Sequence, residues 1–302
     1  MDFDVSEKMQ TILAMVGSFM DGEVIPLEGE MLHGEQRDLD AGVAKAQAHV
    51  REMGLWAANH PAEFGGLGLS MVEHGLLSEA LGRSPLGHLV FGVQAPDAGN
   101  VEILHRHATD EQRERYLRPL VEGTVRSCFS MTEPEMPGSN PVMMATTAVR
   151  DGNDFVINGQ KWFTSSADGA EFAIVMAVTN PDAPPHRRAS MIIVPTNTPG
   201  FNPVRNISVM GDAGSGHASH AEVIYQSCRV PQSNLHDNRM LRIDQVPPIE
   251  VHVIRSGEPP GGIGETGATA GPPALRNAIY AATGVALRRL PIDRKLIAGR
   301  KA

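Results

Sequence analysis

The sequence has little of several features that would place the protein outside the ordinary globular class. Its 302 residues include two cysteines, Cys128 and Cys228, too few for a disulfide framework, so we expect buried reduced thiols. No apolar run approaches the ~20 residues that cross a bilayer. The opening segment MDFDVSEKMQ carries acids where a secretory signal carries lysines. These absences predict a cytoplasmic protein without a membrane span.

Basic residues are also in short supply. The chain has 26 Lys and Arg against 35 Asp and Glu, a formal net charge of −9. This excess of negative charge argues against nonspecific binding to nucleic acid or to an acidic membrane surface. The hydrophobic content of 41% and the charged content of 20% are ordinary for a globular protein. The length allows two or three domains with a sizeable core.

Residues 1–125 have the periodicity of helices. Ser70–Glu73 and Thr109–Gln112 are capping boxes, in which the side chains of the first and fourth residues satisfy the amides at the start of a helix. Val43–Met53 keeps apolar residues at helical spacing. Gly123 is typical of a residue that ends a helix. The first part of the chain is therefore predicted to be a helical domain.

From Arg126 onward the pattern changes to that of strands. Asp151-Gly152 and Asn158-Gly159 are typical of tight hairpin turns. Short alternating or apolar runs occupy residues 127–132, 146–150, 155–157, 161–165, 172–179, 190–195 and 221–228. Several short strands with turn signals at this spacing predict a barrel or a sandwich. The predicted fold class is α+β, with a helical N-terminal domain at 1–126 and a β-barrel middle domain at 127–236.

The composition changes again beyond residue 236. Residues 237–302 hold 10 Lys and Arg and 6 Asp and Glu, whereas the first 236 residues hold 16 and 29. Nine Gly or Pro residues fall within 259–273. A strand at 249–254, a Gly/Pro loop and a helix at 274–283 fit this pattern. The tail at 237–302 is therefore predicted to be a short α/β segment separate from the rest.

Two short motifs invite functional interpretations that their context does not support. Gly262–Gly267 matches the dinucleotide-binding pattern G-x-G-x-x-G, but that fold needs a strand directly before the motif and a helix opening within it. Pairs of prolines stand on both sides instead. His217 and His220 have the spacing of a metal pair, but no third ligand accompanies them. Surface or strand-edge histidines are therefore expected, and no metal site is predicted.

Longer segments carry a more specific signal. FSMTEPEMPGSNP (Phe129–Pro141) and VINGQKWFTSSADG (Val156–Gly169) resemble the two flavin-facing motifs of the acyl-CoA dehydrogenase family, in the family's order and separation. QAPDAGNVEIL (Gln94–Leu104) and SMIIVPTNTPGF (Ser190–Phe201) resemble more particularly the branch close to the tenth and eleventh human members. The resemblance covers nearly all of residues 1–236.

The resemblance implies a set of contacts with FAD. Phe129, Met131 and Thr132 would run along the flavin ring, and the Thr132 hydroxyl would bond its edge. Trp162 would cover one face of the ring, and Thr164 would hydrogen-bond near its N5 atom. Taken alone, Trp162 is more typical of a core aromatic residue, and the two threonines are ordinary strand residues. Only the joint pattern assigns these five residues to a flavin site.

The resemblance also implies a substrate and a reaction. Ser139 would lie near the phosphates or the adenosine diphosphate part of coenzyme A, although one extra residue stands between Thr132 and Gly138, and Asn140 replaces the usual Asp. The reaction would oxidise an acyl-CoA thioester to the 2-enoyl-CoA: a carboxylate takes the α-proton, and the β-hydrogen leaves as hydride to the flavin. Electron transfer flavoprotein would reoxidise the flavin, and the family favours homo-oligomers.

The family's C-terminal helical bundle, which supplies the catalytic carboxylate, does not follow in the sequence. The tail instead resembles the C-terminus of a molybdenum hydroxylase large subunit of the isoquinoline 1-oxidoreductase type. In that family the glutamate that corresponds to Glu265 is the general base. Without the other molybdenum-binding segments, Glu265 is more typical of a solvated loop acid. No catalytic residue is therefore assigned. A non-catalytic remnant that binds flavin or coenzyme A weakly and a molybdenum hydroxylase fragment stay open as alternatives.

Overall fold

The computed structural model describes residues 5–138, 140–231, 280, 281 and 284. The elements discussed below belong to the compact unit Val5–Ile249. Within the helix predicted at 274–283, the two described residues, Tyr280 and Ala281, are helical. Several other predictions lie outside the described residues: the strand at 249–254, the motif Gly262–Gly267, Glu265 and Ser139.

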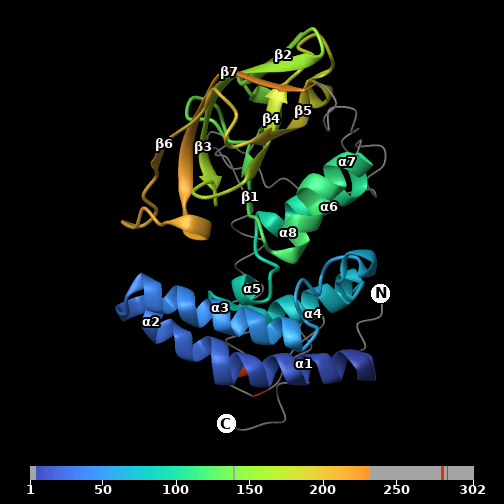
Figure 1. Cartoon of the computed structure of the whole chain (residues 1–302), viewed down its shortest axis with the longest axis vertical. Helices are drawn as coiled ribbons and strands as arrows, with labels where there is room; N and C mark the ends of the chain where they lie inside the picture. The colour runs from blue at the N-terminus through green and yellow to red at the C-terminus, as the bar shows by residue number, and fades with distance from the viewer. Residues whose placement is uncertain (1–4, 139, 232–279, 282–283, 285–302) are drawn as a thin grey trace, which may run out of the picture. The chain divides into compact units, whose positions relative to one another are not determined.

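The first half of the described chain is helical (Figure 1). Its helices are α1 (Glu7–Phe19), α2 (Glu28–His33), α3 (Gln36–Glu52), α4 (Met71–Leu81), α5 (Gly87–Val90), α6 (Asp97–His107), α7 (Asp110–Gln112) and α8 (Arg118–Glu122). Two segments are π-helical. Met20–Val24 follows α1 on the way to α2, and Arg113–Leu117 connects α7 to α8. Each ends within two residues of a proline, which lacks the N–H group that a regular α-helical ladder needs.

Both predicted capping boxes are present. The Ser70 hydroxyl accepts from the Glu73 amide at 3.3 Å, and the Glu73 carboxylate accepts from the Ser70 amide at 2.9 Å, which starts α4. Thr109 and Gln112 exchange the same two bonds at the start of α7. Gly123 ends α8 with φ of 71°, in the left-handed region that glycine adopts without strain. The helix boundaries read from these residues are confirmed.

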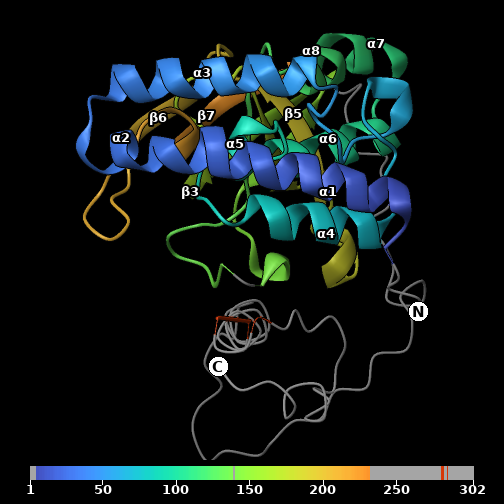
Figure 2. The ribbon, with the colours of Figure 1, turned by 90° about the horizontal axis from the view of Figure 1, so that it is seen from below.

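The helices α1, α3 and α4 are held together by one apolar cluster. The inward residues of α1, α3 and α4 contribute Met9, Val16, Val50, Leu77 and Leu81, each at most 1% exposed. Figure 2 views the layer that these three helices form. Spacings of three, four and seven residues within each helix place these side chains on one face, so burial of that face stabilises the helical region.

The second half of the described chain folds into one curled seven-stranded sheet. Its strands are β1 (Ser127–Ser130), β2 (Thr147–Asp151), β3 (Asp154–Ser165), β4 (Phe172–Val178), β5 (Ala189–Pro195), β6 (Phe201–Asn206) and β7 (His220–Pro231). The hydrogen-bonded order is β1-β4-β2-β3-β7-β6, and β5 pairs with β4 (Figure 1). The predicted α+β class, with a helical region before a curled β region, is confirmed; β6 is an additional strand that the sequence patterns did not indicate.

Strand β4 links the helices to the sheet because it is buried on both faces. Phe172 and Ile174 pack with α6 and α8 residues such as Leu104 and Leu120, while Ala173 and Val175 alternate with them and face the sheet's own core. A strand covered on both faces reads as a continuous apolar run rather than as an alternating one. FAIVMAV has that composition.

One predicted turn is wrong. Asp151-Gly152 does begin the tight connection between β2 and β3, where Asp151 pairs with Asp154. Asn158-Gly159, however, lies inside β3, which continues to Ser165. The register of β3 against β7 shifts between Ile157 and Gly159, so this dipeptide forms an irregularity of the ladder rather than a turn. Gly159 has φ of 154°, a conformation that side chains rarely adopt.

Candidate functional site

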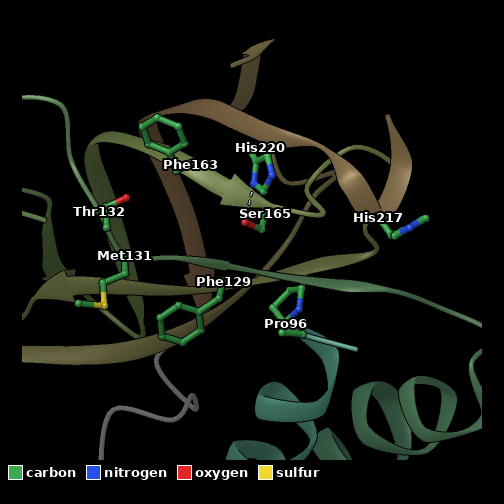
Figure 3. A pocket seen from close by; sticks show the side chains of 9 residues that line it. Pro96, Phe129, Met131, Thr132, Phe163, Ser165, His217 and His220 are labelled. Carbon is green, nitrogen blue, oxygen red and sulfur yellow. Dashed lines mark hydrogen bonds between the residues drawn. The ribbon is translucent and has the colours of Figure 1, made fainter. Parts of the chain in front are cut away.

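A pocket of about 400 Å³ lies where the ends of β1 and β3 meet the start of α6 and of β7 (Figure 3). Nine residues line it: Ala95, Pro96, Phe129, Met131, Thr132, Phe163, Ser165, His217 and His220. They come from four separate stretches of the sequence, and the two family-like motifs contribute five of them. The lining combines two phenyl rings and a methionine with two hydroxyl groups and two imidazoles.

The segment Met131–Thr132, which follows β1, is fixed by bonds to β3. The Met131 carbonyl accepts from the Lys161 ammonium at 2.7 Å. The Thr132 hydroxyl donates to the Trp162 carbonyl at 2.7 Å, and the Thr132 carbonyl accepts from the Trp162 amide at 3.0 Å. Because the Thr132 hydrogen is directed at the main chain, its oxygen can act toward the pocket only as a hydrogen-bond acceptor.

A buried ion pair stands behind this segment. The Lys161 ammonium lies 2.9 Å from a Glu133 carboxylate oxygen, and the side chains are 0% and 6% exposed. The carboxylate also accepts from the Ala145 and Thr146 amides at 2.7 and 2.9 Å. Burial lowers the pKa of Lys161 to about 8, although Glu133 opposes this. Burial acts to raise the pKa of Glu133, but hydrogen bonds, including the one from Lys161, outweigh it and lower that pKa.

Strand β3 turns its side chains at a second irregularity. Its register against β7 shifts between Lys161 and Thr164, and Phe163 has φ of 47°. A bulge of this kind redirects the side chains that follow it, and a positive φ is a strained conformation for a bulky residue. As a result Phe163 and Ser165 face the pocket, while Trp162 is not among its lining residues.

Thr164 faces a different environment. Its hydroxyl is buried and lies 2.9 Å from the hydroxyl of Ser130, which also accepts from the Tyr225 phenol at 2.9 Å. This network closes the sheet's interior behind the pocket. Burial raises the pKa of Tyr225 well above its ordinary value, so the phenol stays a hydrogen-bond donor.

Ser165 and His220 are cross-strand neighbours on β3 and β7. The Ser165 hydroxyl lies 2.8 Å from His220 Nδ1, the contact drawn as a dashed line in Figure 3. His217 lines the same pocket from the short 3₁₀ segment Gly216–Ala218 before β7. His217 is exposed and His220 is the first residue of β7, so the prediction of surface or strand-edge histidines is confirmed. Their spacing gave no sign that both line the pocket, because Ser165 is 55 residues from His220 in sequence.

The helical side of the pocket is anchored to β1 by a buried polar network. The Asp97 carboxylate, at the start of α6, accepts from the Ser127 amide at 2.8 Å and its hydroxyl at 2.6 Å. The Asn100 amide donates to the same hydroxyl at 2.8 Å. Burial raises the pKa of Asp97, although the bonds from Ser127 oppose this. The network holds Pro96, one residue earlier, beside Phe129.

Several features are missing from the part of the chain that the structure describes. No Asp or Glu lines the pocket. Within the same residues, no group of three or more His, Cys, Asp or Glu side chains is arranged for a metal ion, and no helix has the length and apolar character to cross a membrane. Cys128 and Cys228 are free and buried, as expected, and burial raises their pKa values to about 12 and about 11.

Comparison with known families decides the ancestry of this site. Residues 6–124 match the model "Acyl-CoA dehydrogenase, N-terminal domain", and residues 128–228 match "Acyl-CoA dehydrogenase, middle domain". The chain belongs to the acyl-CoA dehydrogenase family. Both motifs that face the pocket lie within the acyl-CoA dehydrogenase middle domain.

The relatives include the predicted branch. Acyl-CoA dehydrogenase family member 11 of Gallus gallus is 38% identical over 244 residues, which covers 77% of this chain and 31% of that protein. Acyl-CoA dehydrogenase FadE2 of Mycobacterium tuberculosis is 37% identical and is covered to 59% of its length. A solved acyl-CoA dehydrogenase structure from Mycobacterium abscessus superposes with a TM-score of 0.71 at 35% identity, over 76% of this chain and 60% of that one. The chain thus spans from 31% to 60% of the length of these relatives.

Of the five residues that the sequence assigned to a flavin, the structure brings three to the pocket. Phe129, Met131 and Thr132 line it, whereas Trp162 and Thr164 do not. The adjacent residues Phe163 and Ser165 line the pocket instead, because the register of β3 shifts between Lys161 and Thr164. An assignment that assumes regular alternation along the strand misses this change. Ser139 and Glu265 lie outside the described residues.

Proposed function

We propose that this chain forms the flavin-binding part of an FAD-dependent acyl-CoA dehydrogenase, which oxidises an acyl-CoA thioester to the 2-enoyl-CoA. The observation that carries the proposal is the convergence of Phe129–Thr132 and Phe163–Ser165, from the two family-like motifs, on one pocket. Membership in the acyl-CoA dehydrogenase family supports the same reaction class.

The chemistry of the lining fits a flavin ring. An isoalloxazine ring is flat and aromatic, with a polar pyrimidine edge. Phe129, Phe163 and Met131 offer apolar contact surface, and aromatic rings pack favourably on such a face. The Thr132 oxygen can accept from a ring N–H group, and the Ser165 hydroxyl stands on the same lining as Phe163. We therefore move the proposed face and N5 contacts from Trp162 and Thr164 to Phe163 and Ser165.

When bound, FAD supplies the acceptor for the two electrons that leave the β-carbon as hydride. The residues of this chain would hold that acceptor and keep water away from it. Phe163, which lies in the bulge of β3, would cover one face of the ring. Phe129 and Met131 would exclude solvent from the rest of the ring. The Lys161–Glu133 pair would keep the Met131 carbonyl turned inward, away from the ligand. Ser139 remains our proposal for the coenzyme A phosphates.

The proton acceptor is a separate question. Among the described residues no carboxylate lines the pocket, so the base that takes the α-proton would have to come from residues outside the described part or from another chain. Loss of a general base typically costs about 10²–10⁴-fold in rate. This observation favours, as a second candidate function, a chain that binds flavin or coenzyme A without catalysing the oxidation.

The remaining proposals concern organisation and partners. We keep the division into 1–126, 127–236 and 237–302, with the tail related to a molybdenum hydroxylase C-terminus. By the family resemblance, we also propose that the chain forms homo-oligomers and that electron transfer flavoprotein reoxidises the flavin. One similar solved structure, at 28% identity and a TM-score of 0.59, is described as electron transferring flavoprotein of Acidaminococcus fermentans, which supports a partner of that kind.

The proposal is tested by the visible spectrum of the FAD-loaded chain before and after anaerobic addition of a medium-chain acyl-CoA. Loss of the flavin absorption on addition supports dehydrogenase activity. A stable flavin spectrum that the acyl-CoA does not bleach supports the non-catalytic candidate instead. Failure to take up FAD from excess overturns the dehydrogenase proposal and leaves of the second candidate only the binding of coenzyme A.

A further inference from the structure

Ser165 and His220 form the only hydrogen-bonded pair of side chains among the nine residues that line the pocket. The hydroxyl and Nδ1 are 2.8 Å apart, and either atom can be the donor. A hydroxyl has one hydrogen, so its direction decides whether Ser165 offers the pocket a donor or only an acceptor. We propose that His220 is a positioning residue that carries its hydrogen on Nδ1 and thereby leaves the Ser165 hydroxyl free to donate into the pocket.

The other hydroxyl group on the lining, that of Thr132, cannot donate a hydrogen bond into the pocket. Thr132 gives its hydrogen to the Trp162 carbonyl at 2.7 Å and can only accept from a ligand. If Ser165 also donated its hydrogen, to His220 Nδ1, both hydroxyl groups of the lining could only accept hydrogen bonds from a ligand. The atoms that need recognition in the proposed reaction, a ring nitrogen of the oxidised flavin and a thioester carbonyl oxygen, are themselves acceptors. A donor from the lining is therefore required, and His220 lets Ser165 supply it.

The backbone around His220 is fixed well enough to hold an imidazole in one orientation. His220 opens β7 directly opposite Ser165, and its carbonyl accepts from the Ile207 amide at 2.8 Å. The preceding residue, Ser219, is fully buried; its hydroxyl donates to the Gly216 carbonyl at 2.7 Å and accepts from the Asp168 amide at 3.1 Å. The main chain of His220 and the residue before it are thus anchored, which makes the hydrogen-bonded pair a preorganised unit.

The inference rests on the proposed function for the identity of the acceptor, but the position of the hydrogen can be measured without a ligand. We would record the imidazole ¹⁵N spectrum of the ligand-free chain at about pH 8, where imidazoles are mainly neutral. The His220 signal is assigned by its loss in His220→Asn. We expect Nδ1 to be the protonated nitrogen. A spectrum with the hydrogen on Nε2 alone would overturn the inference.

FAD binding provides the second readout. His220→Leu removes the bond to Ser165 and should weaken FAD binding about tenfold, with a changed flavin spectrum. His220→Asn keeps an N–H group near the former Nδ1 position and should stay within about threefold of wild type. His186→Asn, at an exposed histidine outside the pocket, is the control that leaves binding unchanged.

The outcomes separate the two proposals. If His220→Leu binds FAD with wild-type affinity and spectrum while remaining folded by circular dichroism, His220 has no positioning role. If Asn fails to restore what Leu loses, a hydrogen bond is not the cause and the inference is again overturned. If the wild-type chain takes up no FAD, the proposed function fails, and the imidazole spectrum still decides where the hydrogen lies.

Discussion

Lys161 has no exposed side-chain area, yet its ammonium has two oxygen partners, the Glu133 carboxylate and the Met131 carbonyl. Such a buried charge is tolerated only while its partners remain. At this scale single side chains decide the site: Lys161 fixes one wall, Thr132 uses its hydrogen internally, and Ser165 is held by His220. The consequence is that removal of one partner should cost more than removal of both.

Replacement of Lys161 by Met should destabilise the protein by about 3 kcal/mol, because Glu133 is left buried without its counter-charge. The double variant Lys161→Met/Glu133→Met should recover part of this loss, since no charge is then left unpaired. Urea unfolding of the wild type and both variants measures the difference. Arg118→Met, which breaks an exposed pair with Glu114, is the control and should change little. A loss below about 1 kcal/mol for Lys161→Met would contradict this account.

His60 gives the helical region a pH dependence. It is 4% exposed, and burial, with a smaller effect of His74, lowers its pKa to about 4. The unfolded chain therefore binds a proton more readily than the folded one between about pH 6.5 and 4, and stability falls as the pH decreases through that range. At pH 4.5 the His60 share of this loss should be about 2 kcal/mol.

His60→Gln should remove the His60 contribution to the loss of stability at low pH. The contributions of His88, His107 and His217, whose pKa values are also lowered, should remain. The measurement is the free energy of unfolding at pH 7 and 4.5 for wild type and variant. An unchanged pH dependence in His60→Gln would show that His60 is not responsible for it.

At the scale of the element, β3 decides how much of the site the sequence could predict. The motif that contains Trp162 and Thr164 identified a strand that lines the pocket. It could not identify which residues face the pocket, because two register shifts against β7 break the alternation on which such an assignment depends. The same irregularities explain why Asn158-Gly159 was taken for a turn. The capping boxes were predictable because their bonds join residues three apart.

Gly159 shows why the first irregularity needs glycine. A Cβ atom there would lie 2.4 Å from the Thr146 hydroxyl oxygen and 2.7 Å from its Cβ, and Thr146 is 1% exposed. Gly159→Ala should therefore destabilise by about 3 kcal/mol, through overpacking together with backbone strain. Gly152→Ala, which has φ of 62° but open space around it, isolates the backbone cost of about 1 kcal/mol. Equal losses in the two variants would show that the contact with Thr146 is unimportant.

At the scale of the whole described unit, the pocket lies at the junction of helices and sheet. Ala95 and Pro96 come from the helical region, the other lining residues come from the sheet and its loops, and the Asp97–Ser127 network ties the two together. Sequence patterns predicted both regions and their order. The pairing of α6 with β1, and of β3 with β7, depends on contacts between residues 30 and 55 positions apart, which no local pattern records.

The central claim is that this pocket holds the flavin ring, and FAD titration followed by difference absorption tests it most directly. The wild-type chain should bind FAD at a single site. Phe163→Asp places a carboxylate on the proposed ring wall and should weaken binding at least about tenfold. The matched variant Val149→Asp changes an equally apolar, 62% exposed residue on β2 and should leave affinity within about twofold. Wild-type affinity in Phe163→Asp, or no binding by the wild type, would contradict the assignment of this pocket to a flavin.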